Sequence, residues 1–266
     1  MKHLLLFTCL LCILSMRLSA QSADSTGAYF NSFDGTRIYY EVKGMGKPVL
    51  LIHGFIVNGE SWKQTVLYTD LQNTGFQVIT MDLRGNGKSD KPHELRYYEQ
   101  DAEAKDIMTL VTLLGLKKYD AVGYSRGSII TSRLLVLDKR LKKAVLGGMG
   151  ADFTDPNWTR RELFYKALMN EPVPELEGMV NYVKRSGLDQ LALAYLQKAQ
   201  PTTTKAEFAK VKRPVLVIAG TEDNDNGKAE ELAALLKHST VKRTPGVHNN
   251  ANHSKEFSAA VIDFLK

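Results

Sequence analysis

The sequence predicts an α/β fold built on a mostly parallel, doubly wound sheet with an antiparallel hairpin at its N-terminal end. Apolar runs at residues 49–52, 78–81, 121–122, 144–146 and 215–219 are typical of strands buried on both faces, as in the interior of a parallel sheet. Helical patterns separate most of these runs, and alternating strands and helices form right-handed βαβ units. A chain of 266 residues with 44% hydrophobic and 24% charged residues can build one such domain.

The hairpin comes first, at residues 31–41. Asp34-Gly35 supplies a tight turn, and apolar residues at 38, 40 and 42 alternate with polar ones, which indicates an antiparallel edge. The other elements expected between and after the buried strands are helices at 61–73, 99–114, 128–138, 228–237 and 255–265 and a last strand near 240–243.

The alternation of strands and helices stops at residues 152–213. Helical stretches at 159–169, 174–186 and 188–199 follow one another there without a strand between them. We therefore expect a core formed by residues 21–151 and 214–266, with 152–213 as a helical cap over the carboxyl ends of the strands, where open α/β sheets bind ligands. The apolar side chains of this segment fit a largely apolar substrate pocket or, more simply, the packing face of its helices.

The first twenty residues have the pattern of a secretory signal peptide. A short basic start is followed by an apolar run at 4–16 and by Leu18-Ser19-Ala20. Cleavage after Ala20 is expected in preference to a single membrane anchor, for which the run is short. The protein would then be periplasmic or secreted, without a stable membrane span. Because Cys9 and Cys12 are the only cysteines, the mature chain would have no disulfide or thiol chemistry.

The net charge and the motifs of the chain limit the kinds of partner and cofactor that it is expected to bind. Cleavage would remove Lys2 and Arg17 and take the net charge from +6 to a mild +4. The mature chain would contain no basic run longer than two residues, so nucleic-acid binding is not expected. Neither a His/Cys/Asp cluster with ligand spacing nor a Gly-rich phosphate loop is present in the sequence, so we expect no metal and no cofactor. No feature of the sequence predicts an oligomeric state.

One stretch has the pattern of a nucleophile elbow. A strand at 119–124 leads into GYSRG at 123–127, and a helix follows directly. Glycines two residues before and two after a serine let two backbones approach closely, while the serine is held in a strained conformation with its hydroxyl exposed. Ser125 is therefore the candidate nucleophile.

Further motifs stand in order at the ends of the expected strands. With the elbow, they make the chain resemble the α/β-hydrolase family from residue 34 to the C-terminus, and the order Ser, Asp, His is the order that this fold uses for its triad. The motifs are DGT at 34–36, HGF at 53–55, DLRGNGKS at 82–89, GTED at 220–223 and PGVH at 245–248.

The resemblance implies a catalytic triad. A serine hydroxyl is a poor nucleophile near neutral pH, so a histidine must accept its proton, and an acid must orient that histidine. The resemblance assigns these roles to Ser125, His248 and Asp223. His253 lies in the same loop as His248, but its position fits a solvated residue at a helix N-terminus better.

The acid has two alternatives. Asp223 has the spacing from Gly220 that the family uses, whereas Asp225 lies in the same loop. Asp152 ends the strand before the insertion, where some relatives place the acid. Asp223 is the preferred candidate.

The resemblance also implies an oxyanion hole, in which backbone N–H groups stabilise the charge that develops during acyl transfer. The matching donors are the N–H groups of Phe55 and Arg126. His53 is interpreted as a turn residue that bonds to the backbone, and Asp82 and Arg84 as a structural ion pair or turn network.

Two residues of the elbow depart from the family pattern. Arg126 stands where the family usually has an uncharged residue, and Ser128 replaces a common glycine. Since a cation in the first turn of a helix opposes the helix dipole, we hypothesise that the Arg126 guanidinium meets an acid from the cap or an anionic group of the substrate. The alternative is a surface arginine turned into solvent.

The expected function is that of an exported serine hydrolase. It would cleave a carboxylic ester or related acyl bond of a small-molecule substrate through an acyl-enzyme on Ser125. A thioesterase, lactonase, amidase or carbon–carbon hydrolase would show the same triad. Relatives that open epoxides or remove halides use an aspartate nucleophile, and Ser125 argues against both reactions. An alternative of another class is a ligand-binding scaffold that has the same fold and negligible turnover.

Overall fold

A computed structural model describes residues 27–266, which form an eight-stranded sheet with the strand order β1-β2-β4-β3-β5-β6-β7-β8. β1 pairs with β2 and β2 with β4 in antiparallel fashion, and every other neighbouring pair is parallel. The predicted sheet with its N-terminal hairpin is thus confirmed. The strands are β1 (Ala28–Asn31), β2 (Arg37–Lys43), β3 (Lys47–Ile52), β4 (Phe76–Met81), β5 (Tyr119–Tyr124), β6 (Leu141–Gly147), β7 (Val215–Gly220) and β8 (Ser239–Thr244).

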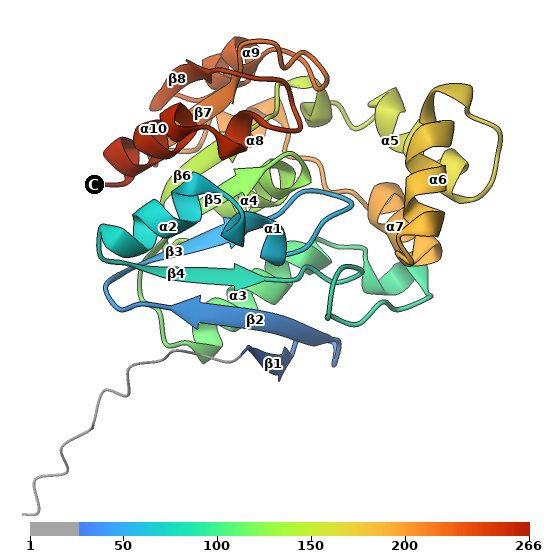
Figure 1. Ribbon diagram of the computed structural model, residues 1–266, viewed down its shortest axis with the longest axis horizontal. Helices are drawn as coiled ribbons and strands as arrows, with labels where there is room; N and C mark the ends of the chain where they lie inside the picture. Colours follow the sequence, from blue (N-terminus) through green and yellow to red (C-terminus); the bar gives the residue numbers. More distant parts are fainter. Residues whose placement is uncertain (1–26) are drawn as a thin grey trace, which may run out of the picture.

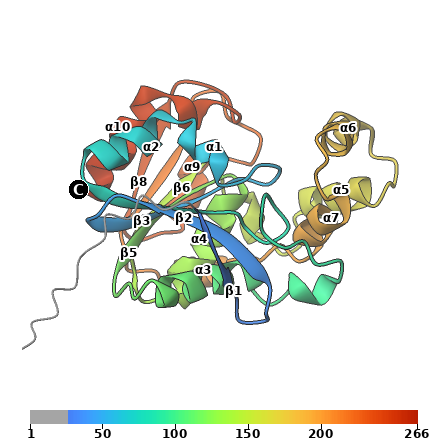
Figure 2. The same ribbon diagram turned by 60° about the horizontal axis from the view of Figure 1, so that its bottom comes forward.

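Helices cover both faces of the sheet (Figures 1 and 2). Successive residues of a strand point to opposite faces, so a strand that is apolar throughout packs on both. In β3, Leu50 and Ile52 belong to the core on one face, whereas Val49 and Leu51 belong to the core on the other. The first face is covered by α3 (Ala102–Leu113), α4 (Arg126–Leu137) and α9 (Ala229–Ala234), and the second by α1 (Glu60–Lys63), α2 (Val66–Asn73) and α10 (Lys255–Leu265).

The single helix expected at 61–73 is wrong, because the structure divides it into α1 and α2. Thr65 has an extended backbone, and its side chain accepts a hydrogen bond from the N–H of Tyr68 at 3.3 Å. A threonine in this position caps a new helix. The other predicted helices and strands agree with the observed bounds to within a few residues.

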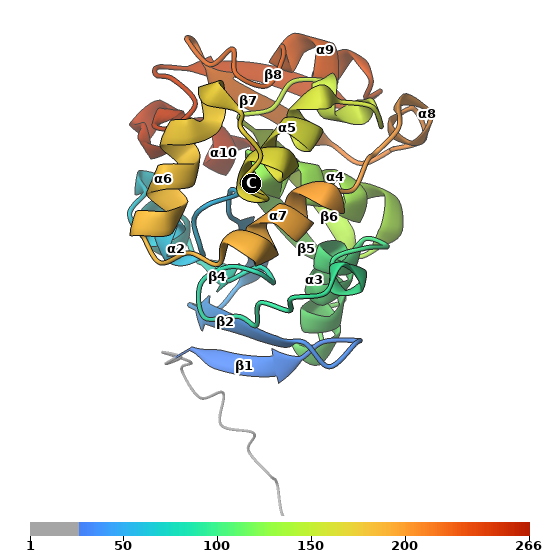
Figure 3. The same ribbon diagram turned by 90° about the vertical axis from the view of Figure 1, so that its right-hand side faces the viewer.

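Residues 152–213 are called the cap segment below, and the helices of its residues 159–198 lie beyond the carboxyl ends of the parallel strands (Figure 1). Figure 3 looks from this side, with the cap helices in front of the sheet. The three expected helices are present, and α8 is an additional short one that begins with a capping box of Thr204 and Glu207. The helices are α5 (Thr159–Leu168), α6 (Glu177–Arg185), α7 (Gln190–Lys198) and α8 (Lys205–Phe208).

The cap segment has its own small apolar core. Leu168, Val183, Leu193 and Leu196 are buried together against Tyr98, a residue of the loop between β4 and α3. The division of the chain into separate core and cap domains remains a prediction. Short 3-10 turns complete the structure at η1 (Leu95–Tyr97), η2 (Asp152–Thr154), η3 (Pro174–Leu176) and η4 (Ala251–His253).

The predicted signal peptide at residues 1–20 lies outside the described part of the chain. Within residues 27–266, no helix has both the length and the apolar character that a membrane crossing requires.

Candidate active site

Ser125 occupies the sharp turn between β5 and α4. Its φ of 55° and ψ of −122° place it in a region that non-glycine residues rarely adopt, at a cost of roughly 1–3 kcal/mol. A Cβ on Gly123 would overlap the carbonyl of Gly127, and one on Gly127 would overlap the carbonyl of Ile52. The two glycines therefore let α4 pack closely against β5 and β3, and the elbow inferred from the sequence is present.

Ser128, the second departure from the family pattern, has a structural explanation. Its hydroxyl lies 2.7 Å from the carbonyl oxygen of Gly147 and 3.0 Å from that of Gly123. The N–H of Ser125 also donates to Gly147, at 2.8 Å. Ser128 thus ties the strained turn to the end of β6.

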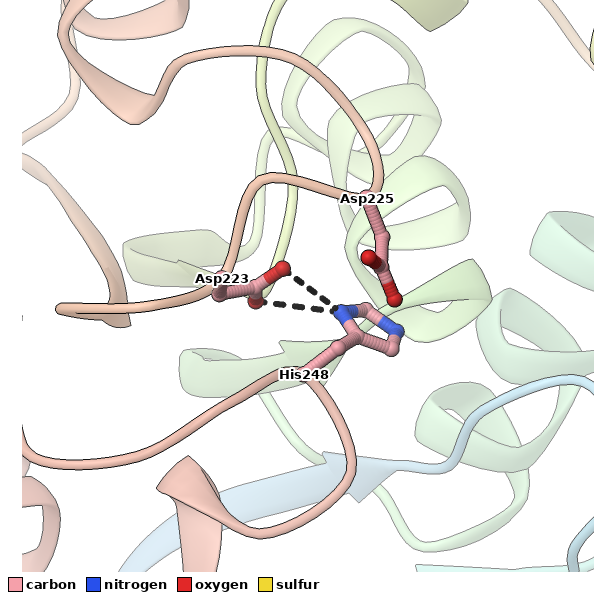
Figure 4. Close-up of side chains that lie close together, drawn as sticks. All are labelled: Asp223, Asp225 and His248. Carbon is pink, nitrogen blue, oxygen red and sulfur yellow. Dashed lines mark hydrogen bonds and ion pairs between the residues drawn. The ribbon is translucent and has the colours of Figure 1, made fainter.

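The structure brings Ser125, His248 and Asp223 together in one hydrogen-bonded chain. His248 Nε2 lies 3.0 Å from Ser125 Oγ, and His248 Nδ1 lies 3.0 and 3.2 Å from the carboxylate oxygens of Asp223 (Figure 4). Asp223 is only 4% exposed, so its carboxylate is shielded from competing water. An Nδ1–H that donates to Asp223 leaves Nε2 free to accept the serine proton, as a triad requires.

Tyr124 also holds the histidine loop, and Asn226 lies beside the His248 ring; neither residue was identified from the sequence. The Tyr124 hydroxyl donates to the His248 carbonyl at 2.7 Å, and burial raises the pKa of Tyr124, which keeps it a donor. Asn226 Nδ2 lies 3.4 Å from His248 Nδ1. Tyr124 could have been found from the sequence, because it directly precedes the proposed nucleophile.

The alternatives to Asp223 and His248 are placed less favourably. Asp225 is exposed and lies beside His248 without a hydrogen bond to it (Figure 4). One ligand-type atom from each of Asp223, Asp225 and His248 lies within 4.8 Å of the others, close enough to share a metal ion, although the sequence shows no such cluster. Both ring nitrogens of His248 already have partners, Asp223 and Ser125. Asp152 and His253 are exposed and make no hydrogen bond to Ser125 or His248.

The DLRGNGKS motif supports the loop that carries Phe55. Asn86 Nδ2 donates to the carbonyls of Phe55 at 2.7 Å and Val57 at 3.0 Å. The Asp82 carboxylate accepts from the N–H groups of Gly59 at 2.8 Å and Lys88 at 2.7 Å. Asp82 is therefore part of a turn network, and Asn86 is a positioning residue that sequence reasoning did not single out.

Arg84 has acidic partners other than Asp82. Its fully buried guanidinium pairs with Asp106 at 2.5 Å and with Asp34 of the hairpin turn at 2.8 Å. This agrees with a structural ion pair that joins the hairpin to α3.

His53 is a buried turn residue. Its Nε2 accepts a hydrogen bond from the N–H of Leu83 at 3.0 Å, and its Nδ1 lies 2.7 Å from the Gly54 carbonyl. Burial lowers the pKa of His53, which favours the neutral ring that this pair of bonds requires. The interpretation of His53 as a residue bonded to the backbone agrees with these contacts.

The two N–H groups expected in the oxyanion hole come from the loop after β3 and from the first residue of α4. The first N–H groups of a helix have no partner within the helix. Neither the Phe55 nor the Arg126 N–H makes a hydrogen bond to another residue of the described 27–266 range. Gly54, which precedes Phe55, lies next to the Ser125 side chain.

The burial and the partner of the Arg126 side chain contradict two of the expectations. It is 3% exposed, so the solvent-exposed alternative is wrong. It also meets an acid, but that acid is Glu103 of α3 and not a residue of the cap. Arg126 Nη2 lies 2.5 Å and Nε 3.1 Å from the Glu103 carboxylate, while Nη1 lies 3.4 Å from the side-chain oxygen of Gln200.

Two cavities meet at the triad, one of about 450 Å³ and one of about 60 Å³. Ser125, His248, Phe55, Arg160 and Phe164 line both of them. The ring centroids of Phe55 and Phe164 are 6.0 Å apart in an edge-to-face arrangement. One aromatic residue of the core and one of the cap segment thus stand where the two cavities join.

These features are those of the α/β-hydrolase fold family, and the chain belongs to it. Residues 47–170 match the family model described as alpha/beta hydrolase fold. A protein of Bacillus subtilis named AB hydrolase superfamily protein YisY is 30% identical, over 90% of this chain and 85% of its own.

Relatives named as haloperoxidases are similar as well. A Synechocystis protein provisionally named a non-heme chloroperoxidase is 45% identical, over 86% of this chain and 95% of its own. The crystal structure of a bromoperoxidase from Bacillus anthracis aligns with a TM-score of 0.75 and 27% identity, covering 90% of this chain and 99% of that one. Together these relatives support hydrolase chemistry of the α/β-hydrolase type.

Proposed function

We propose that the protein is a serine hydrolase that cleaves a carboxylic ester or related acyl bond through an acyl-enzyme on Ser125. The observation that carries this proposal is the hydrogen-bonded chain from Ser125 Oγ through His248 to Asp223, on an elbow strained to expose the serine. A thiol ester, lactone, amide or carbon–carbon bond would use the same groups.

In this mechanism His248 Nε2 accepts the proton of Ser125 as Oγ forms a bond to the acyl carbon. The N–H groups of Phe55 and Arg126 stabilise the resulting oxyanion, and each such donor contributes about 10²- to 10³-fold in rate. The bond to the leaving oxygen then breaks, and His248 gives its proton to that oxygen. Water, deprotonated by His248, attacks the acyl-enzyme, and the acid is released as Ser125 regains its proton.

The test combines covalent labelling with turnover. A fluorophosphonate probe should label the wild-type chain and not Ser125→Ala. A series of 4-nitrophenyl esters of graded acyl length should be hydrolysed by the wild type alone. No labelling and no turnover of any ester would overturn the proposal, and labelling without turnover of esters, thioesters, lactones or amides would favour a ligand-binding scaffold.

A second candidate function rests on the 45% identical relative named as a non-heme chloroperoxidase. The same acyl-enzyme can react with hydrogen peroxide in place of water. The peroxide oxygen then bonds to the acyl carbon, the bond to Oγ breaks, and a peracid leaves. The peracid oxidises a halide ion to hypohalous acid and is itself reduced to the carboxylic acid. Halogenation of monochlorodimedone should then require hydrogen peroxide, a carboxylic acid and Ser125 together.

Export is a further part of the proposal. It rests on the basic start, the apolar run and the small residues up to Ala20. N-terminal sequencing of the mature protein should find Gln21 as the first residue, and an intact N-terminus on the purified native protein would contradict it.

A further inference from the structure

The arrangement of the two cavities separates the two parts of a substrate. In the proposed function His248 gives its proton to the leaving group, so that group must lie on the side of the histidine loop. The same loop contributes Asn249, Asn252 and His253 to the large cavity. The small cavity is lined by Arg126 and Ile129 of the nucleophile helix, so it is the place for the acyl chain.

The small cavity has an unusually polar lining for an acyl site. Gln197 and Gln200 are 6% and 7% exposed, and both line it. The Gln197 amide makes no hydrogen bond to any residue of the described range 27–266. Gln200 accepts from Arg126, and its NH₂ group likewise has no partner in that range. Neither NH₂ group is among the fully buried polar groups of the described range that lack a partner, so both are accessible from the cavity and can donate to a ligand that carries hydrogen-bond acceptors.

Arg160 adds a positive charge at the same place. It comes from α5, is half-buried, and lies over the ring of Phe164 with 4.7 Å between the guanidinium carbon and the ring centroid. It lines both cavities and forms no ion pair with a described residue. The other guanidinium of the small cavity, that of Arg126, is already neutralised by Glu103.

The position of Arg160 is unfavourable without an anion. It stands in the first turn of α5, where the helix dipole disfavours a cation. Burial lowers its pKa, and the attraction of Asp225 acts in the opposite direction. Asp225 is exposed at the rim of the large cavity, so water screens its attraction for the guanidinium.

From these contacts we propose that the small cavity binds a carboxylate at the end of a short acyl chain. Arg160 pairs with the negative charge, and the NH₂ groups of Gln197 and Gln200 donate hydrogen bonds to the carboxylate oxygens. The preferred substrates are then half-esters of short dicarboxylic acids, because a cavity of about 60 Å³ admits few carbon atoms. This inference rests on the proposed function and names its substrate class.

Two isosteric esters test it. Mono-(4-nitrophenyl) glutarate carries a terminal carboxylate, and 4-nitrophenyl 5-methylhexanoate has an isopropyl group of the same shape in its place. We expect the wild-type chain to favour the glutarate in kcat/KM by about 10-fold or more, as for a charge-assisted hydrogen bond. Arg160→Gln should remove this preference, because it lowers kcat/KM for the glutarate much more than for the neutral ester.

Gln197→Leu should reduce the preference by about 3- to 10-fold, because it removes a neutral donor only. Lys166→Gln is the matched control, since Lys166 also lies on α5 but lines neither cavity. It should keep the wild-type preference. Equal hydrolysis of the two esters by the wild type, or an equal loss of both in Arg160→Gln, would overturn the inference while leaving the serine hydrolase intact.

A binding measurement does not depend on turnover. Calorimetry with Ser125→Ala should show tighter binding of glutarate than of 5-methylhexanoate, and the difference should disappear when Arg160→Gln is added. If the wild type hydrolyses no ester and fails to react with the fluorophosphonate, the proposed function itself has failed. Glutarate binding that is independent of Arg160 overturns the substrate class alone.

Discussion

The sheet core and the cap segment contribute to the site in different ways. In the core, Ser125, His248 and Asp223 are linked to one another. Ser128 fixes the turn of Ser125, Tyr124 the loop of His248, and Asn86 the loop of Phe55. In the cap segment, the side chains of Arg160 and Gln197 line the small cavity, and Arg160 also lines the large one. Neither side chain has a hydrogen-bond partner in the described range. Groups held by hydrogen bonds are suited to a fixed reaction, whereas groups without partners are suited to a ligand.

The same difference is seen in the packing. The core consists of two large apolar clusters on the two faces of the sheet, and helices α5, α6 and α7 of the cap segment form a separate, smaller one. The Arg126–Glu103 pair lies between the two regions, with Gln200 beside it. We therefore expect substitutions in the core to affect the rate of reaction or the stability of the fold, and substitutions in the cap segment to affect the choice of substrate.

The largest effect is expected from a comparison of Asp223 and Asp225, the two aspartates of the loop after β7. Asp223→Asn should lower kcat by about 10⁴-fold, because an amide stabilises the wrong histidine tautomer. Asp225→Asn should change kcat on a neutral ester by less than about 3-fold, since Asp225 makes no hydrogen bond to His248. Steady-state kinetics on one 4-nitrophenyl ester measures both. A large loss in Asp225→Asn together with a small one in Asp223→Asn would assign the acid to Asp225 instead.

The core residues could be predicted because their signals are local. The two glycines around Ser125 are required by backbone contacts that span a few residues, and the acid and histidine stand at fixed distances from the ends of β7 and β8. Buried strands were recognisable because apolar residues on both faces leave an unbroken run. The division at Thr65 was missed because a threonine is compatible with both a helix interior and a cap.

The partner of Arg126 could not be predicted. Glu103 is 23 residues away in the sequence and contacts Arg126 only because α3 and α4 pack side by side. Such a contact depends on the angle and register between two helices, which the apolar pattern does not define. The hypothesis that Arg126 meets an acid was therefore right, but the acid comes from α3 and not from the cap segment.

Breaking this pair has the second largest expected effect. Glu103→Leu would leave the Arg126 guanidinium buried without its counter-charge, which should lower the free energy of unfolding by about 3–5 kcal/mol. Urea denaturation measures the change. The double variant Glu103→Leu with Arg126→Met should recover most of the stability, because an apolar pair of similar volume has no charge to desolvate. Equal stability of the single variant and the wild type would show that the pair lies in contact with water.

A smaller effect is expected at the junction of the two cavities. Phe164→Ala removes the edge-to-face partner of Phe55 and joins the cavities into a wider space. Discrimination between short and long acyl chains should fall by about 3- to 10-fold in kcat/KM, as expected for an aromatic pair. Leu163→Ala, an exposed neighbour on α5, is the control and should keep the wild-type profile. Unchanged discrimination in Phe164→Ala would assign chain-length selection to other residues.

The residues that the cap segment contributes to the site could not be predicted from the sequence. The apolar residues recognised in the segment divide between the two alternatives: Leu168 and Tyr195 pack in the apolar core of the cap helices, whereas Phe164 lines the cavities. Arg160 and Gln197 are ordinary surface residue types on amphipathic helices. Only their position in a cavity next to Ser125 distinguishes them, and that position depends on how α5 and α7 lie over the strand ends (Figure 1).

The smallest predicted effect tests the charge balance between the two regions. Asp225 of the core faces the rim of the large cavity and repels an anionic substrate on its way to Arg160. Asp225→Asn should therefore raise kcat/KM for mono-(4-nitrophenyl) glutarate by about 2- to 5-fold at low ionic strength. The gain should shrink near 1 M salt, where the screening length is about 3 Å.

The matched control for this last variant is Glu222→Gln. Glu222 is also an exposed acid of the same loop but lines neither cavity. Glu222→Gln should have a smaller effect on the glutarate ester, and neither variant should alter hydrolysis of the neutral isostere by more than about 2-fold. If both variants raised kcat/KM for the anion equally, the net charge of the protein and not the local field at Arg160 would control the encounter. The selection of an anion would then be a property of the whole surface, and the distinction between a core that reacts and a cap that selects would no longer hold.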